Sequence, residues 1–210
     1  MKRRIIFVLA ITCVEMPFVC AKPVQRNLDA GLLTAINDNN FKKAKFLLSQ
    51  GASVNARDAD GETALIKASF VGEPKEEPTL RVHPLIFLKL LLSHGANTNL
   101  KDKDGNTALM TAAKGSPEAV KRLIAKGAQI NVKNNNGETA LMQTIDWECE
   151  GSCSSPDTVK LLLSKGADIN SLDKDGNTAL IWAARLPSYA RVNAMVLDFI
   201  ELSTFDYVFR

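Results

Sequence analysis

Residues that could catalyse a reaction or bind a metal are scarce in this chain of 210 residues. The two histidines, His83 and His94, are too few for a site built from several histidines. The sequence contains no Gly-x-Ser-x-Gly elbow, no glycine-rich phosphate loop and no His-Glu-x-x-His motif. The aspartates at positions 58, 102 and 173 recur once per repeat and are expected to form turns. We therefore predict no catalytic residues, no cofactor and no metal site.

The N-terminus has the pattern of a secretory signal peptide. Basic residues at positions 2–4 precede an apolar run over 5–14, and a cleavage motif ends at Ala21. The run is too short for a membrane-spanning helix, which takes about 20 apolar residues. We expect residues 1–21 to be removed, the mature protein to be periplasmic or secreted, and no stable membrane insertion to follow.

Two cysteines, Cys149 and Cys153, remain in the mature chain. An even number of cysteines in an exported protein favours a disulfide, with two free thiols as the alternative. Because the enclosed loop is so short, the bond would stiffen it locally and add little global stability.

The composition excludes several classes of protein. With 46% hydrophobic and 23% charged residues, the chain is too apolar to be disordered. A formal net charge of +3 is small for a protein that coats nucleic acid or an anionic membrane. The aromatic share of 6%, with abundant Leu and Ala, favours helices over sheets.

An internal repeat determines the architecture. The motif Gly-x-Thr-Ala-Leu begins at Gly61, Gly105, Gly137 and Gly176, and each copy starts ten residues after the start of a Gly-Ala-x-x-Asn motif. All variation in spacing lies between Thr-Ala-Leu and the next Gly-Ala. We therefore place the insertions, including those at 71–83 and 147–156, in the same connection of each repeat, along one edge of the stack.

Each repeat is predicted to contain a turn and two helices. Asp-Gly or Asn-Gly pairs supply the positive φ of a tight turn, and the Thr of the motif can cap the following helix. The second helix carries an apolar stripe, for example Val120, Leu123 and Ile124. Neither helix can bury its apolar face alone, so neighbouring repeats must stack to form the core.

These motifs resemble the ankyrin repeat family, whose pattern runs D-x-x-G-x-T-P-L-H-x-A-A, then V-x-x-L-L, then G-A-x-V-N. The chain departs from this pattern by having Ala for the motif's Pro and Ile or Met for its His. The resemblance implies an all-α solenoid of about five helix-turn-helix units joined by short hairpin loops. The expected segments are a linker at 22–27, repeats at 28–55, 56–99, 100–131, 132–170 and 171–203, and a C-terminal tail at 204–210.

The resemblance also implies a non-catalytic module that binds a protein partner through its hairpin tips and concave first-helix face. Two alternatives remain open: an immunity- or inhibitor-like protein that blocks a toxin or envelope enzyme, and an enzyme with an unrecognised site. We expect a monomer that does not bind nucleic acid. The implied binding residues are Arg57, Glu62, Phe70, Lys101, Lys103, Asn106, Lys114, Lys133, Asn135, Glu138, Asp146, Trp147, Lys174 and Arg185.

This implied surface leans basic. Arg57, Lys101 and Lys133 occupy equivalent positions in three successive hairpins and are expected to form a row of cations along the tips. Exchanging Lys101 and Lys133 for Glu is expected to weaken partner binding and to leave stability nearly unchanged, as exposed substitutions usually do.

Overall fold

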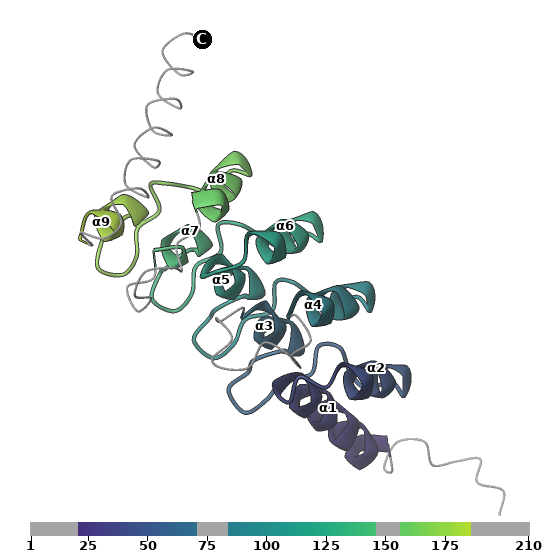
Figure 1. The fold of residues 1–210 in the computed structure, drawn as a ribbon. Coiled ribbons are helices and arrows are strands. Elements are labelled where there is room, and N and C mark those ends of the chain that lie inside the picture. The colour runs from purple at the N-terminus through teal and green to yellow at the C-terminus, as the bar shows by residue number, and fades with distance from the viewer. Residues whose placement is uncertain (1–20, 71–83, 146–155, 186–210) are drawn as a thin grey trace, which may run out of the picture.

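The structure, a computed structural model, describes residues 21–70, 84–145 and 156–185, which form a row of paired helices (Figure 1). The predicted signal segment lies outside these residues, except for Ala21. Also outside are both insertions, apart from Pro156, and the second half of the last predicted repeat with the tail. Asp146, Trp147, Cys149 and Cys153 therefore have no structural description.

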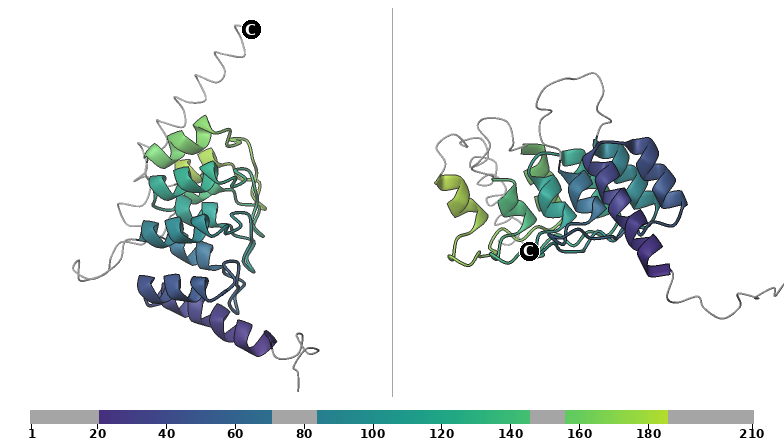
Figure 2. Two further views of the ribbon diagram at one scale, coloured as in Figure 1. Left: turned by 90° about the vertical axis from the view of Figure 1, so that its right-hand side faces the viewer. Right: turned by 90° about the horizontal axis from the view of Figure 1, so that it is seen from below.

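The described helices form two columns. The first helices of the repeats, here the inner helices, are α1 (Ala21–Asn37), α3 (Ala64–Ser69), α5 (Ala108–Ala113), α7 (Ala140–Gln143) and α9 (Ala179–Ala184). The second helices, here the outer helices, are α2 (Phe41–Ser49), α4 (Pro84–Ser93), α6 (Pro117–Ala125) and α8 (Pro156–Ser164). The hairpin loops project together to one side of the stack (Figure 2). The predicted all-α solenoid is confirmed.

Helix α1 begins before the first predicted repeat. Residues 22–27, predicted to be a linker, belong to this 17-residue helix. Pro23 stands in the first turn, where proline is tolerated, and nothing in the next four residues interrupts a helix. The helix is also tied to the following loop, because Gln25 donates a hydrogen bond to the Gly51 carbonyl and Asp29 accepts one from the Ser53 N–H.

The predicted threonine caps are present at every inner helix that follows a Gly-x-Thr motif. The hydroxyl oxygen of each Thr accepts a hydrogen bond from the N–H three residues later, over 3.2–3.4 Å. These contacts satisfy one of the free N–H groups at each helix start. The capping residues are Thr63, Thr107, Thr139 and Thr178.

The core is continuous along the stack. Inner helices α3, α5 and α7 pack on one another in sequence, and each pairs with its own outer helix. The outer helices contribute the predicted apolar stripe, whose central members are fully buried. These members are Leu88, Leu91, Val120, Leu123, Val159 and Leu162. Within the part of the chain that the structure describes, no helix is long and apolar enough to span a membrane.

The turn glycines differ in how closely the next repeat approaches them. Gly105 has φ +81°, and a Cβ there would lie 2.8 Å from the backbone nitrogen of Asn135. Gly176 occupies the equivalent turn position with φ +77°, and a Cβ there would meet no atom of the described residues within 4 Å. Gly105 therefore provides both a left-handed turn and a close backbone contact between hairpins, whereas Gly176 provides only the turn.

The substitution Gly105→Ala is expected to destabilise the protein more than Gly176→Ala, by roughly 1–3 kcal/mol. Both variants bear the cost of a left-handed alanine, about 1–2 kcal/mol. Only Gly105→Ala must also push apart the hairpins of two neighbouring repeats. Urea unfolding of the two variants measures the difference, and equal losses would show that the hairpins do not approach each other as described.

Candidate functional site

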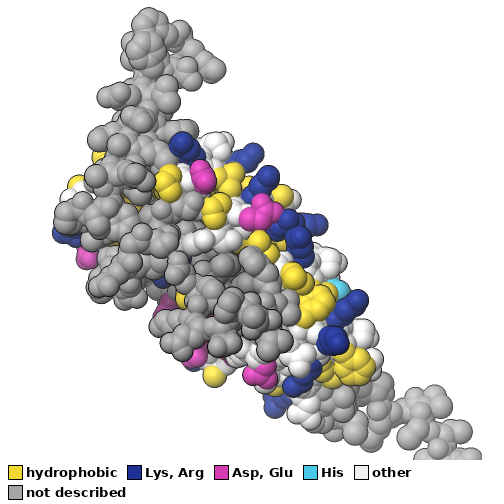
Figure 3. Space-filling model, viewed as in Figure 1, with side chains coloured by type: hydrophobic (Ala, Val, Ile, Leu, Met, Phe, Trp, Pro, Cys, Tyr) yellow, Lys and Arg dark blue, Asp and Glu magenta, His cyan; other side chains and the backbone are white. Residues whose placement is uncertain are grey.

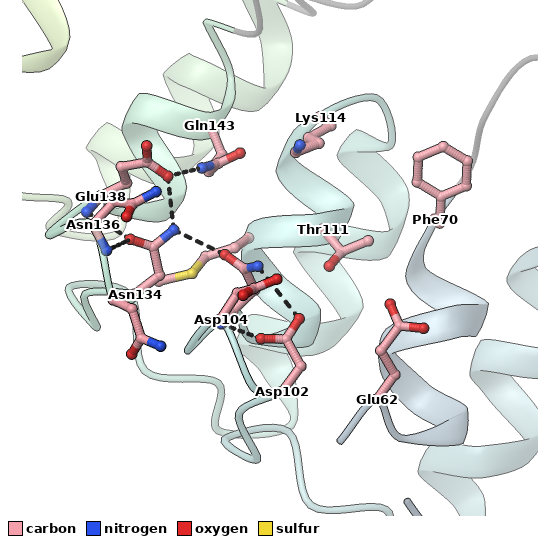
Figure 4. A pocket seen from close by; sticks show the side chains of 13 residues that line it. Glu62, Phe70, Asp102, Asp104, Thr111, Lys114, Asn134, Asn136, Glu138 and Gln143 are labelled. Atoms are coloured by element: carbon pink, nitrogen blue, oxygen red, sulfur yellow. Dashed lines mark hydrogen bonds between the residues drawn. The ribbon is translucent and has the colours of Figure 1, made fainter. Parts of the chain in front are cut away.

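A groove of about 410 Å³ lies where three successive hairpins meet the inner helices α3, α5 and α7 (Figure 4). The hairpins provide its polar wall, and the helices provide the opposite wall. The lining residues are Glu62, Phe70, Asp102, Asp104, Asn106, Met110, Thr111, Lys114, Asn134, Asn135, Asn136, Glu138 and Gln143.

A hydrogen-bond network fixes the polar wall. The side-chain amide of Asn134 donates to Asn106 Oδ1 over 2.9 Å and to Glu138 Oε2 over 2.7 Å. Gln143 at the end of α7 donates to the same carboxylate oxygen over 2.6 Å. The network links two hairpins to an inner helix (Figure 4). The wall is therefore organised in advance of any ligand.

The groove is also lined by Phe70, Asp104 and Lys114. Phe70, at the end of α3, is 61% exposed although its ring is large and apolar. Asp104 is exposed at a hairpin tip, and its carboxylate makes no hydrogen bond with another residue of the described segments. Lys114 directly follows α5 and lies between Gln143 and Phe70 in the view of Figure 4. Large exposed aromatic residues are typical of contact surfaces.

The groove lining is acidic, not basic. Four carboxylates line it, and Lys114 is the single basic residue among the lining residues. The sequence-based expectation of a basic surface is wrong for this region, because the carboxylates of the turns gather on the groove side. The carboxylates are Glu62, Asp102, Asp104 and Glu138.

The groove contains six of the residues predicted to bind a partner: Glu62, Phe70, Asn106, Lys114, Asn135 and Glu138. Lys103, Lys174 and Arg185 are exposed outside the groove. Sequence reasoning missed Asp102 and Asn134, which it assigned to turn formation or left aside. Both residues do form turns, since Asp102 accepts from the Asn106 N–H and Asn134 from the N–H groups of residues 136 and 138. Their position in the lining of the groove depends on how the repeats stack.

The cations expected at the hairpin tips, Arg57, Lys101 and Lys133, link successive repeats and are here called the cation ladder. Arg57 donates to the carbonyl of Lys101, Lys101 Nζ donates to the carbonyl of Lys133 over 2.8 Å, and Lys133 Nζ donates to the carbonyl of Leu172 over 2.8 Å. Each side chain thus reaches the backbone of the equivalent residue in the next repeat. Because both lysines contact the next repeat, we now expect Glu at positions 101 and 133 to lower stability as well as to change the charge of the surface.

An ion pair borders the groove at the first hairpin. Lys67 Nζ lies 2.8 Å from Asp58 Oδ2 and 2.6 Å from Glu62 Oε2. Desolvation by burial raises the pKa of Asp58, but hydrogen bonds from Lys67 and from the N–H groups of Glu62 and Asp60 outweigh it and lower the pKa below the ordinary value. Desolvation lowers the pKa of Lys67, and its contacts with the two carboxylates outweigh this and raise it. The pair therefore stays charged at neutral pH.

Trp182 takes the place of Lys67 in the last described repeat. Each residue stands four positions after a capping Thr, and the Trp182 indole N–H donates to Asp173 Oδ2 over 2.7 Å. Burial raises the pKa of Asp173, but hydrogen bonds from Asn177, Trp182 and the Asp175 N–H lower it overall. Trp182 is half-buried, and this contact gives it a role within the fold.

Basic side chains predominate on the described outer helices. Lys and Arg side chains gather along the side that the outer helices form (Figure 3). The sequences of α2, α4, α6 and α8 contain seven Lys or Arg residues and two acidic residues. Across the described residues, no group of three His, Cys, Asp or Glu side chains is placed to hold a metal ion.

Comparison with known families agrees with the geometry of the stack. The family model described as ankyrin repeats (3 copies) matches residues 83–173, and the model described as ankyrin repeats (many copies) matches residues 32–72. The chain belongs to the ankyrin repeat family. A comparison with curated proteins found no match. Ankyrin repeats are protein–protein interaction modules, and the groove lies on the face formed by their hairpins and inner helices.

Proposed function

We propose that this ankyrin repeat protein is an exported monomer that binds a protein partner in the groove between its three central hairpins. The observation that carries the proposal is the groove itself, with a fixed polar wall, the exposed carboxylate of Asp104 and a large exposed aromatic ring. Partners dock most tightly where rigid surfaces meet buried aromatic anchors.

The acidic lining of the groove favours a partner segment with basic side chains. Asp104 is exposed and unpaired by other described side chains, so its carboxylate can accept a hydrogen bond from a Lys or Arg of the partner. Phe70 can cover the aliphatic stem of the same side chain or pack on an apolar neighbour. The Asn side chains supply further donors and acceptors for a peptide backbone.

The protein acts in this proposal by binding and not by catalysis. The Glu138 carboxylate is engaged by amide donors and Glu62 by Lys67, so neither is available as a free general base. We include Asp146 and Trp147 in the proposed contact surface because they stand three and four residues after the end of α7 in the sequence. Lys103, Lys174 and Arg185 would flank the bound partner.

Affinity capture tests the binding function. Immobilised protein is incubated with an envelope extract of the host, and the retained proteins are identified by mass spectrometry. We expect one partner to be retained in an amount comparable to the bait and to be released by free protein added in excess. Retention of no protein above the level of a bait-free matrix would contradict the proposal.

Export is tested on protein isolated from the host. We expect N-terminal sequencing to begin at Lys22, since a basic start and an apolar run precede Ala21.

Intact mass before and after reduction and alkylation is expected to reveal a Cys149–Cys153 disulfide. An intact Met1 on cytoplasmic protein would contradict export, and two thiols that alkylate without reduction would contradict the disulfide.

A further inference from the structure

Each of the described outer helices, α2, α4, α6 and α8, presents one lysine at the same position. Lys45, Lys89, Lys121 and Lys160 each stand six residues before the glycine that closes their repeat. All four side chains are exposed. None forms an ion pair or a hydrogen bond through its side chain with another residue in the described segments. Stacking therefore aligns them as a row of free cations along the outer side.

This row differs from the cation ladder of the hairpins. Each cation of the ladder is bound to a carbonyl of the neighbouring repeat, whereas the ammonium groups of the outer row face solvent. Lys42 and Lys43 on α2 add to the outer row. The two acidic residues of the outer helices are Glu118, which pairs with Arg122, and Asp157. The outer side is thus strongly basic although the whole chain carries a net charge of only +3.

Two large apolar side chains stand among these cations. Phe46 on α2 is 60% exposed, and Ile86 on α4 is 41% exposed. Phe46 lies one helical turn from Lys42, and Ile86 lies three residues before Lys89, so each shares a helix face with a lysine. Basic side chains around exposed apolar groups are typical of protein surfaces that adsorb to anionic membranes.

We propose that the outer side of the stack, formed by α2, α4, α6 and α8, docks on an anionic phospholipid bilayer. The lysine row meets the lipid phosphates, while Phe46 and Ile86 enter the boundary between headgroups and acyl chains. The chain lies on the membrane and does not span it. The groove, on the hairpin side, stays open to a protein partner. A soluble polyanion would account for the lysines but would leave the aliphatic Ile86 unburied.

Vesicle co-sedimentation tests this docking with the form of the protein that accumulates in the host. Vesicles contain either phosphatidylcholine alone or a mixture of phosphatidylcholine and phosphatidylglycerol. We expect binding to the mixed vesicles, little binding to pure phosphatidylcholine, and loss of binding in high salt. Each lysine near an anionic membrane strengthens binding roughly fivefold. The double substitution Lys89→Glu with Lys121→Glu is therefore expected to lower the partition coefficient at least tenfold.

The matched control is Lys103→Glu with Lys174→Glu. These lysines are exposed at hairpin tips, and their side chains make no hydrogen bond or ion pair within the described segments. The change in net charge is the same in both double variants. We expect this control to change the partition coefficient less than twofold, and Phe46→Ser to lower it several-fold. Circular dichroism verifies that all variants are folded, and any retained N-terminal segment is common to all of them.

Three results would overturn the proposal. Equal losses in the two double variants would show that only net charge matters. Equal binding to both vesicle types would show that the lysine row does not direct docking. Binding to duplex DNA or heparin, but not to mixed vesicles, would assign the outer side to a soluble polyanion. Because none of these assays involves the groove, their failure leaves the proposed protein-binding function to be judged by affinity capture.

Discussion

Leu123→Ala is expected to lower the free energy of unfolding by about 2–5 kcal/mol, because the substitution leaves a cavity where repeats stack. Leu123 is 0% exposed and lies on α6, which packs against α5 and α8. The neighbouring helices are held by their own hairpins and caps, so they cannot close fully around the missing atoms. Urea unfolding followed by circular dichroism measures the loss.

Leu172→Ala makes the same chemical change on the surface. Leu172 is 49% exposed, and its contribution to the ladder is a backbone carbonyl that alanine retains. Its expected cost is less than about 0.5 kcal/mol. If both variants lost the same free energy, Leu123 would not occupy the interior of the stack.

The elements of the fold could be predicted from the sequence because each depends on local signals. A capping Thr, a turn Gly and an apolar stripe act within one repeat, and their fixed phase predicted the order of helices. The predicted linker at 22–27 precedes the recurring motifs, so no repeat pattern indicated that these residues are helical. The contacts of Gln25 and Asp29 with the next loop are likewise revealed by no local pattern.

The character of the groove could not be predicted, because it depends on distances between repeats. Asp102 and Asn134 are turn residues within their own hairpins. Only the stacking of the repeats brings both of them into the lining of one groove. In the same way, the sequence indicates that Lys101 and Lys133 are equivalent but not that each reaches the carbonyl of the next repeat. Predicting contacts between repeats requires knowledge of the rise and twist of the stack.

Net charge also concealed the distribution of charge. The formal value of +3 argued against an anionic partner surface, yet the described outer helices carry seven basic and two acidic residues, while four carboxylates line the groove. The net charge does not show which side of the molecule each charged residue lies on. The electrostatic field at a surface depends on the charges that face it. The repeat phase does contain that information, since every outer-helix lysine of the row stands at one position.

The second large effect is expected on partner binding when the free edge of the groove is altered. In the double variant Phe70→Ala with Asp104→Lys, the aromatic anchor is removed and a carboxylate is replaced by a cation. Neither side chain contributes to the hydrogen-bond network of the wall, so folding should be retained. Because loss of one dominant contact costs about 2 kcal/mol or more, the dissociation constant should rise roughly thirtyfold or more.

A matched double variant, Phe46→Ala with Asp175→Lys, is available elsewhere on the stack. Phe46 is 60% exposed against 61% for Phe70, and Asp175 stands at the turn position equivalent to Asp104. Neither residue lines the groove. The two double variants therefore undergo the same chemical changes and the same change in net charge.

The most direct test of protein binding in the groove is titration calorimetry of the captured partner against the wild-type protein and both double variants. Binding in the groove predicts that Phe70→Ala with Asp104→Lys weakens binding at least about thirtyfold, and that Phe46→Ala with Asp175→Lys changes it less than about threefold. Equal affinities for all three folded proteins, or a larger loss in the second variant, would contradict it.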